Sequence, residues 1–187
     1  MEAFLISTGI VALAEMGDKT QLLALLLAAR FRKPWPIVAG ILVATLANHA
    51  AAGAVGAWIQ TLVSPSTLRI VLGVSFLVMA VWMLIPDKID DDAGAKAPRL
   101  GVFGTTVVLF FLAEIGDKTQ IATVMLAARY EAALAWVVAG TTLGMMLANA
   151  PAVWLGEKLT KRVPVRAVHV VSAVIFTVLG VAALLSA

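Results

Sequence analysis

Two short charged motifs stand out in an otherwise apolar chain, and they have almost the same sequence. Residues 14–21 read AEMGDKTQ and residues 113–120 read AEIGDKTQ, so seven of eight positions are identical at an offset of 99. Each copy supplies two carboxylates, a lysine ammonium, a hydroxyl and an amide. Carboxylates in this number can bind a metal cation or take up protons, and these are the two kinds of chemistry that the motifs offer.

The composition of the chain predicts where these motifs lie. Of 187 residues, 61% are hydrophobic and only 13% are charged, and the mean hydropathy is +0.99. A soluble domain is about 45–50% apolar and about 25% charged. The composition therefore excludes a soluble fold, a disordered chain and, at a net charge of +3, a nucleic-acid partner. The absence of cysteine excludes disulfides, thiolate redox chemistry and zinc–thiolate sites. An integral membrane protein in contact with lipid remains.

The apolar runs predict six membrane-spanning helices, because a bilayer core takes about 20 apolar residues per helix. The runs are continuous rather than alternating, which disfavours strands and predicts an all-α fold. The first and fourth spans are interrupted by the two motifs, and the polar stretch 86–99 is the only loop of any length. No cleavable signal peptide is expected, so the first span is retained. The expected spans are about 3–29, 37–63, 68–85, 100–128, 134–155 and 165–185.

The distribution of lysine and arginine predicts the orientation. The loops after the first, third and fifth spans carry ten basic residues, and the opposite loops carry only Arg69 and Arg129. We therefore expect a multi-pass protein of the inner (plasma) membrane with both termini on the non-cytoplasmic side. An aromatic belt is expected from the tryptophans near the span ends, which are Trp35, Trp58, Trp82, Trp136 and Trp154.

The similarity between the two halves extends beyond the motifs. Residues 28–30, 38–40 and 46–48 recur as 127–129, 138–140 and 147–149. Each half holds three spans, and an odd number makes the second copy enter the membrane from the opposite side. The sequence thus predicts an inverted 3+3 repeat, with repeat 1 at 1–85, a cytoplasmic linker at 86–99 and repeat 2 at 100–187. Such proteins place their site near mid-membrane, where the two repeats meet.

The motif acids are the candidate metal ligands. On a helix, Glu15 and Asp18 share a face, as do Glu114 and Asp117, so inverted symmetry brings four carboxylates together. A ligand set made only of oxygen suits calcium, magnesium or manganese. One divalent ion would neutralise four carboxylates and two lysines, and crowded carboxylates can take protons when the metal leaves. The expected supporting residues are Thr20, Gln21 and Asn48, with their counterparts Thr119, Gln120 and Asn149.

The roles of several other motif residues stay open at this point. Lys19 and Lys118 are countercharges that either move during a transport cycle or hold the bundle together. A salt bridge between Glu15 and Lys19 within one motif is the structural alternative to an ion site. Gly17 and Gly116 either loosen the helix or permit close packing. The small residues Gly140, Gly144 and Ala148 predict a helix-packing ridge.

The histidines and methionines carry weaker signals. His49 follows Asn48 but has no histidine counterpart in the second half, so a hydrogen-bonded bundle histidine is favoured over a proton relay. His169 is expected at the cytoplasmic membrane interface. The seven methionines are scattered and are expected to fill gaps in the core.

The doubled Glu-x-Gly-Asp-Lys-Thr motif, at 15–20 and 114–119, resembles the signature of a known family. It is the cation/proton exchanger family of the Golgi manganese and calcium transporter of yeast and humans, and the resemblance covers nearly the whole chain. It implies export of divalent cations, manganese in bacteria, coupled to proton entry. By this resemblance the four motif acids bind the ion, and Lys19, Thr20, Lys118 and Thr119 occupy the family's conserved basic and hydroxyl positions.

The favoured interpretation is a secondary active transporter that exports Mn²⁺ in exchange for protons by alternating access. A Ca²⁺/H⁺ exchanger on the same scaffold is the nearest alternative, and a passive divalent cation channel is the next. A membrane enzyme or electron carrier, with haem between His49 and His169, and an amino-acid exporter are more remote. No catalytic residue and no resident cofactor is expected, because the metal ion and the protons are substrates. Whether the protein forms a homodimer is left open.

Overall fold

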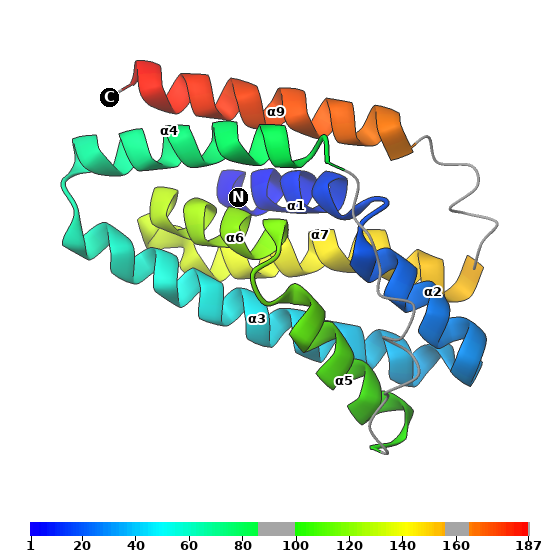
Figure 1. Ribbon diagram of the computed structural model, residues 1–187. Helices are drawn as coiled ribbons and strands as arrows, with labels where there is room; N and C mark the ends of the chain where they lie inside the picture. Colours follow the sequence, from blue (N-terminus) through cyan, green and yellow to red (C-terminus); the bar gives the residue numbers. More distant parts are fainter. Residues whose placement is uncertain (86–99, 156–164, 187) are drawn as a thin grey trace.

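The computed structural model describes residues 1–85, 100–155 and 165–186, and over these residues the chain is helical without a strand (Figure 1). The expected linker and six of the ten basic residues expected on the cytoplasmic side lie outside the described residues. The elements are α1 (Glu2–Glu15), α2 (Lys19–Phe31), α3 (Pro34–Leu62), α4 (Pro65–Trp82), α5 (Gly101–Glu114), α6 (Lys118–Arg129), the short 3₁₀ helix η1 (Glu131–Ala133), α7 (Leu134–Leu155) and α9 (Val165–Leu185).

Four of these helices, α3, α4, α7 and α9, are long and apolar enough to cross a membrane. The prediction of an all-helical, multi-pass membrane protein is therefore confirmed. Helices α1, α2, α5 and α6 have only 12 to 14 residues each. At 1.5 Å per residue such a helix is about 20 Å long, which is less than the roughly 30 Å of a bilayer core. The pairs α1–α2 and α5–α6 occupy the expected first and fourth spans, and each pair is divided at a charged motif.

Short-range signals in the sequence set the helix ends. Pro34 and Pro65 lie at the start of α3 and α4, where a missing N–H costs no helical hydrogen bond. The Ser64 hydroxyl caps α4 by accepting a hydrogen bond from the Thr67 amide at 3.2 Å. Helix α2 ends at Phe31, and the next residue, Arg32, caps it by adopting the left-handed conformation and donating its N–H to the Ala28 carbonyl.

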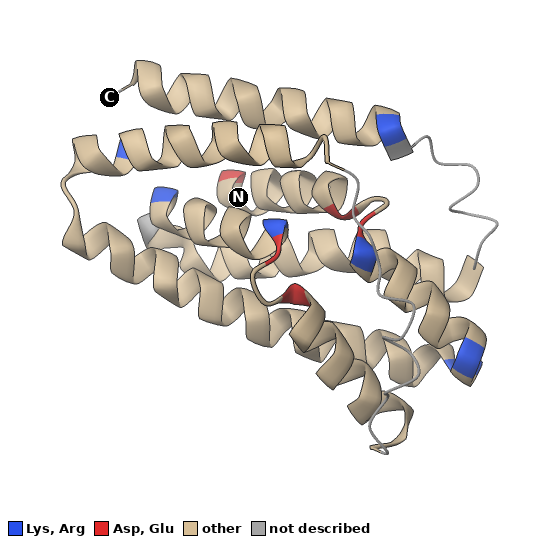
Figure 2. Cartoon of the chain, viewed as in Figure 1, with Lys and Arg blue, Asp and Glu red and all other residues tan. Residues whose placement is uncertain are grey.

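Two apolar clusters form the core, and each divided helix contributes one half to each cluster. The first cluster joins α1 and α6 to α4, α7 and α9, and Phe76 and Phe176 lie at its centre. The second cluster joins α2 and α5 to α3 and α7, and it includes Leu27, Ile41 and Phe110. The two charged breaks therefore lie at the boundary between the clusters. In Figure 2 the acidic positions of the motifs occupy the middle of the molecule, at these breaks.

Two glycines at equivalent positions each let a helix of one half pack closely on a helix of the other half. A methyl group at Gly140 on α7 would lie 2.5 Å from the Phe4 carbonyl oxygen on α1. At Gly40 on α3 it would lie 3.0 Å from the Phe103 carbonyl oxygen on α5. Phe4 and Phe103 are equivalent positions in the two halves. Gly144 also packs on α1, so the expected packing ridge on α7 is confirmed.

The outer helices α4 and α9 run side by side along one edge of the bundle (Figure 1). They approach closely at Gly73 and Gly180, where each glycine faces the other's carbonyl oxygen. Trp35 and Trp154 make an edge-to-face contact, with ring centroids 5.4 Å apart, where α3 begins and α7 ends. Their exposed positions near helix ends, like those of Trp58 and Trp136, are those expected of an aromatic belt.

Candidate cation-binding site at the two helix breaks

The two breaks have the same backbone structure. Helix α1 ends at Glu15 and α2 begins at Lys19, while α5 ends at Glu114 and α6 begins at Lys118. Between them Gly17 and Gly116 adopt positive φ values of 83° and 76°, a region that other residues adopt at a cost. Glycine is therefore needed at these two positions because the helix is interrupted there, rather than because two helices pack closely.

The motif glutamines stabilise these breaks. The Gly17 N–H donates to Gln21 Oε1 at 3.0 Å, and the Gly116 N–H donates to Gln120 Oε1 at 2.7 Å. Each glutamine oxygen thereby satisfies an amide that the interrupted helix leaves free. The Gln21 side chain also donates to the Ala148 carbonyl at 2.9 Å, which ties the first break to α7.

A glycine-to-alanine pair tests the importance of the backbone conformation. Gly116→Ala is expected to lower stability by about 1–2 kcal/mol, because alanine must adopt a left-handed conformation there while its methyl group meets no other atom. Gly9→Ala on α1 is the matched control, since it also meets no atom but has no positive φ. Thermal unfolding in detergent measures both. Equal melting temperatures for the two variants would contradict the conclusion that Gly116 is needed for its left-handed backbone conformation.

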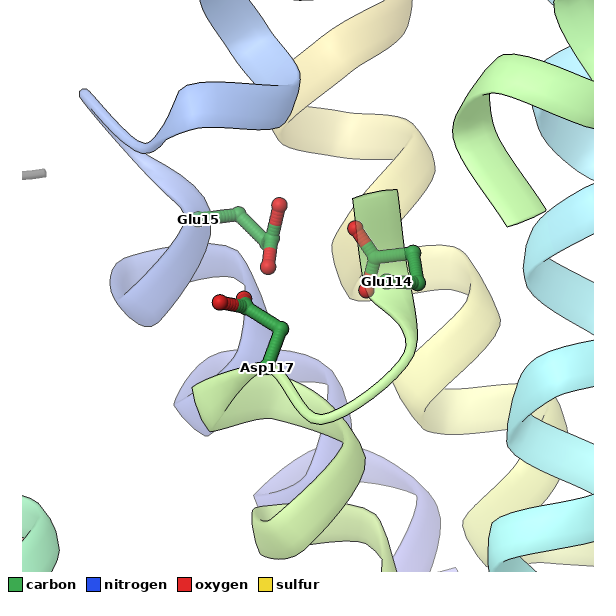
Figure 3. A group of neighbouring side chains, drawn as sticks. All are labelled: Glu15, Glu114 and Asp117. Carbon is green, nitrogen blue, oxygen red and sulfur yellow. The ribbon is translucent and has the colours of Figure 1, made fainter. Parts of the chain in front are cut away.

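Three carboxylates from both halves converge at the breaks. One oxygen from each of Glu15, Glu114 and Asp117 lies within 4.8 Å of the others, and Figure 3 shows the three side chains turned toward one another. Both glutamates are fully buried and Asp117 is 3% exposed. Two oxygens bound to one calcium ion are at most about 5.2 Å apart, so a single hard cation can contact all three groups.

The motif threonines orient the two glutamates. Thr20 Oγ1 donates to Glu15 Oε2 at 2.5 Å, and Thr119 Oγ1 donates to Glu114 Oε2 at 3.0 Å. The second oxygen, Oε1, of each glutamate is buried and has no hydrogen-bond partner among the described residues. A buried carboxylate oxygen without a partner is costly, and a bound cation or a proton removes that cost.

The two lysines connect the motifs to each other. Lys118 Nζ lies 2.7 Å from Asp18 Oδ1, and Lys19 Nζ lies 2.8 Å from Asp117 Oδ1. Both aspartates occupy the position before the first residue of a helix, yet neither side chain caps its own helix. Each pairs instead with the lysine of the other half, whereas the sequence alternative paired Glu15 with Lys19 inside one motif. Lys118 is 1% exposed and Lys19 is 29% exposed, so the two pairs differ in their access to solvent.

The two asparagines have different surroundings. Asn149 on α7 reaches the site, because its Nδ2 lies 3.4 Å from Glu15 Oε2. The same nitrogen lies 2.9 Å from the Met145 sulfur and 3.1 Å from the Met145 carbonyl oxygen. Asn48 on α3 donates to the Phe111 carbonyl on α5 at 3.1 Å instead. The equivalence of these two residues in the sequence thus does not extend to their contacts.

Three residues differ from their sequence-based expectations. His169 lies near the start of α9, as expected, but it is buried: it is only 8% exposed, and its Nε2 lies 3.2 Å from the Met16 carbonyl, because α9 packs on α1 beside the first break. Met145 does more than fill the core, since its sulfur contacts Asn149. Its position one helical turn before Asn149 is the signal in the sequence. His49 is fully buried, and neither ring nitrogen has a hydrogen-bond partner in the described part of the chain, so the favoured hydrogen bond is absent there.

A multi-helix membrane protein with buried, converging carboxylates at two helix breaks has the features of a cation transporter. The sequence matches the family described as "Divalent cation/proton antiporter GDT1" over residues 3–91 and 102–187, one range in each half. The chain belongs to this family. It is therefore a multi-pass membrane protein of a cation-transporting family, a family of transporters rather than enzymes, and the ions are its substrates.

Individual relatives agree with this assignment. The chain is 51% identical over 182 residues to the "Putative manganese exporter" of Vibrio cholerae, which covers 97% of this chain and 90% of the relative. It is 27% identical over 200 residues to the GDT1-like protein sll0615 of Synechocystis, covering 97% and 96% of the two chains. A GDT1-like protein 3 of rice is 27% identical over 201 residues, covering 94% of this chain and 71% of the relative. No solved structure matches the chain.

Proposed function

We propose that the protein exports Mn²⁺ from the cytoplasm in exchange for protons, by alternating access across an inner membrane. The spans are α1–α2, α3 and α4 in repeat 1 (1–85) and α5–α6, α7 and α9 in inverted repeat 2 (100–187), joined by the cytoplasmic linker 86–99. Both termini lie on the non-cytoplasmic side, as the distribution of basic residues predicts.

The exchanged packing of the two halves supports the inverted arrangement. The first half of one divided span, α1, shares an apolar cluster with the second half of the other, α6. The helices α2 and α5 share the second cluster in the same way. When one repeat is inverted in the membrane, its first half-helix lies at the same depth as the second half-helix of the other repeat. Both breaks then lie at mid-membrane, between two apolar layers.

The observation that carries the proposal is the buried group formed by Glu15, Glu114 and Asp117. Three carboxylates this close, at membrane depth, repel one another strongly when all are ionised. A divalent cation or added protons relieve that repulsion, and the same oxygens cannot hold both at full occupancy. Mutually exclusive binding of metal and protons is the requirement for exchange.

The two cross-motif ion pairs provide a means of coupling. Asp117 belongs to the carboxylate group and also pairs with Lys19, while Asp18 pairs with Lys118. A bound cation competes with the lysines for these aspartates, so metal binding and the pairing between the two halves depend on each other. We propose Asp18 as the fourth acid ligand and the two lysines as countercharges. The supporting residues are Thr20, Thr119, Gln21, Gln120, Asn48 and Asn149.

Manganese is proposed as the preferred ion because the Vibrio cholerae relative carries the name of a manganese exporter and shares half of its residues with this chain. The carboxylates alone do not distinguish Mn²⁺ from Ca²⁺, since both ions accept oxygen ligands. A Ca²⁺/H⁺ exchanger is therefore the alternative that the experiment must address.

The test is Mn²⁺ flux in proteoliposomes with an imposed pH gradient and a clamped membrane potential. We expect an acidic interior to drive Mn²⁺ uptake, and we expect an ionophore that collapses the pH gradient to stop it. Ca²⁺ is added as the competitor. Flux that ignores the pH gradient would overturn the exchanger and indicate a channel. Stronger competition by Ca²⁺ than by unlabelled Mn²⁺ would establish the calcium alternative.

A further inference from the structure

We infer that Met145 is a specificity-determining residue whose thioether sulfur favours transition-metal ions over Ca²⁺ and Mg²⁺ at the site. The inference rests on the proposed function, since it concerns the ion that the carboxylates accept. It adds a donor of a different chemical kind to a site that otherwise offers only oxygen.

The geometry connects the sulfur to one carboxylate of the site, that of Glu15, through the Asn149 amide. The Asn149 side-chain nitrogen lies 2.9 Å from Met145 Sδ and 3.4 Å from Glu15 Oε2. All three residues are fully buried. Asn149 Oδ1 is also buried and has no hydrogen-bond partner among the described residues. A small rotation of this amide presents its oxygen to a cation and releases the sulfur to the same cation.

The first half of the chain has no equivalent sulfur. The residue one helical turn before Asn48 is Ala44, which is fully buried in the second apolar cluster. Asn48 itself bonds to the Phe111 carbonyl and not to a glutamate. The two halves are thus nearly identical in their charged motifs and differ in this donor. Among the described residues, Asn149 is the one asparagine that reaches a motif acid, and Met145 lies against it. A methionine that only filled the core would not need this position.

The sulfur is expected to change which metal ions the site prefers. Calcium and magnesium are hard ions that bind oxygen ligands and gain little from a thioether. First-row transition metals bind nitrogen and sulfur donors with increasing strength along their series, and thioethers suit soft ions best. A single thioether therefore penalises Ca²⁺ and Mg²⁺ relative to Mn²⁺, and it favours a thiophilic ion such as Cd²⁺ even more.

The experiment compares Met145→Leu with wild type in proteoliposomes carrying Mn²⁺ flux driven by a pH gradient, with Ca²⁺, Mg²⁺ and Cd²⁺ as competitors. Leucine has nearly the same volume as methionine, and the backbone carbonyl of residue 145 can still accept the hydrogen bond from Asn149. We expect Ca²⁺ to compete about tenfold better in the variant and Cd²⁺ to compete about tenfold worse. Met145→Gln, which offers an oxygen at similar reach, is expected to shift the preference toward Ca²⁺. Met146→Leu is the matched control, because Met146 packs against the second apolar cluster.

The outcomes separate this inference from the proposed function. If wild-type vesicles show no flux driven by the pH gradient, the proposed function fails. If wild type exchanges normally and Met145→Leu weakens Mn²⁺ transport and every competitor by the same factor, the methionine only positions Asn149 and the inference is overturned. An unchanged order of competitors in Met145→Leu overturns it as well. A variant that is poorly folded is recognised by its melting temperature, and Met145→Gln then supplies the test.

Discussion

Glu15→Gln and Glu114→Gln are each expected to reduce Mn²⁺ flux driven by a pH gradient by about 100-fold or more, to the leak of protein-free vesicles. Glutamine keeps the shape of the side chain and still accepts the hydrogen bond from Thr20 or Thr119. It removes the negative charge and cannot exchange a proton. The substitution therefore removes cation binding and proton coupling together while it leaves the packing intact.

Glu2→Gln is the control for these two variants, because it is the same chemical change at an exposed position at the start of α1. Its flux is expected to stay within about twofold of wild type, since an exposed side chain far from a binding site contributes little to it. Binding of Mn²⁺ to detergent-solubilised protein gives an independent measurement. Wild-type flux in either site variant would show that the buried carboxylates are structural and that the ion binds elsewhere.

Lys118→Met is expected to destabilise the protein by roughly 3–5 kcal/mol, because it leaves the buried carboxylate of Asp18 without its lysine. The double variant Asp18→Asn/Lys118→Met removes both charges and is expected to recover most of that loss. It is not expected to recover transport, since Asp18 is proposed as an ion ligand. Thermal unfolding in detergent and flux in vesicles, measured on the same preparations, separate the two effects.

The pair formed by Lys19 and Asp117 provides the comparison. Lys19 is 29% exposed, so water replaces part of the lost interaction and Lys19→Met is expected to destabilise the protein less than Lys118→Met. A double variant of Asp18 and Lys118 that transports at the wild-type rate would contradict a role for Asp18 in the site. That result would indicate that the pair formed by Asp18 and Lys118 only holds the two halves together.

Much of the architecture could be predicted because its signals are local. A continuous apolar run predicts a membrane helix without knowledge of its neighbours, and four of the six expected runs are long apolar helices in the structure. The interruption at each motif was also predictable, since charges and a glycine within an apolar run disfavour a regular helix. The two glycines have positive φ values at these interruptions.

The contacts within the site depend on how the halves dock, and no local signal predicts that. Spacing along a helix permitted a pair between Glu15 and Lys19 as the structural alternative to an ion site, but the lysines pair with aspartates about a hundred residues away. The sequence alone determined the class of protein and the acids at its centre, because hydrophobicity and a repeated motif are properties of short segments. Only the tertiary structure decided which lysine neutralises which aspartate, and that Asn149 rather than Asn48 reaches a glutamate. These contacts join residues from different helices, and their geometry is set by the packing of the whole bundle.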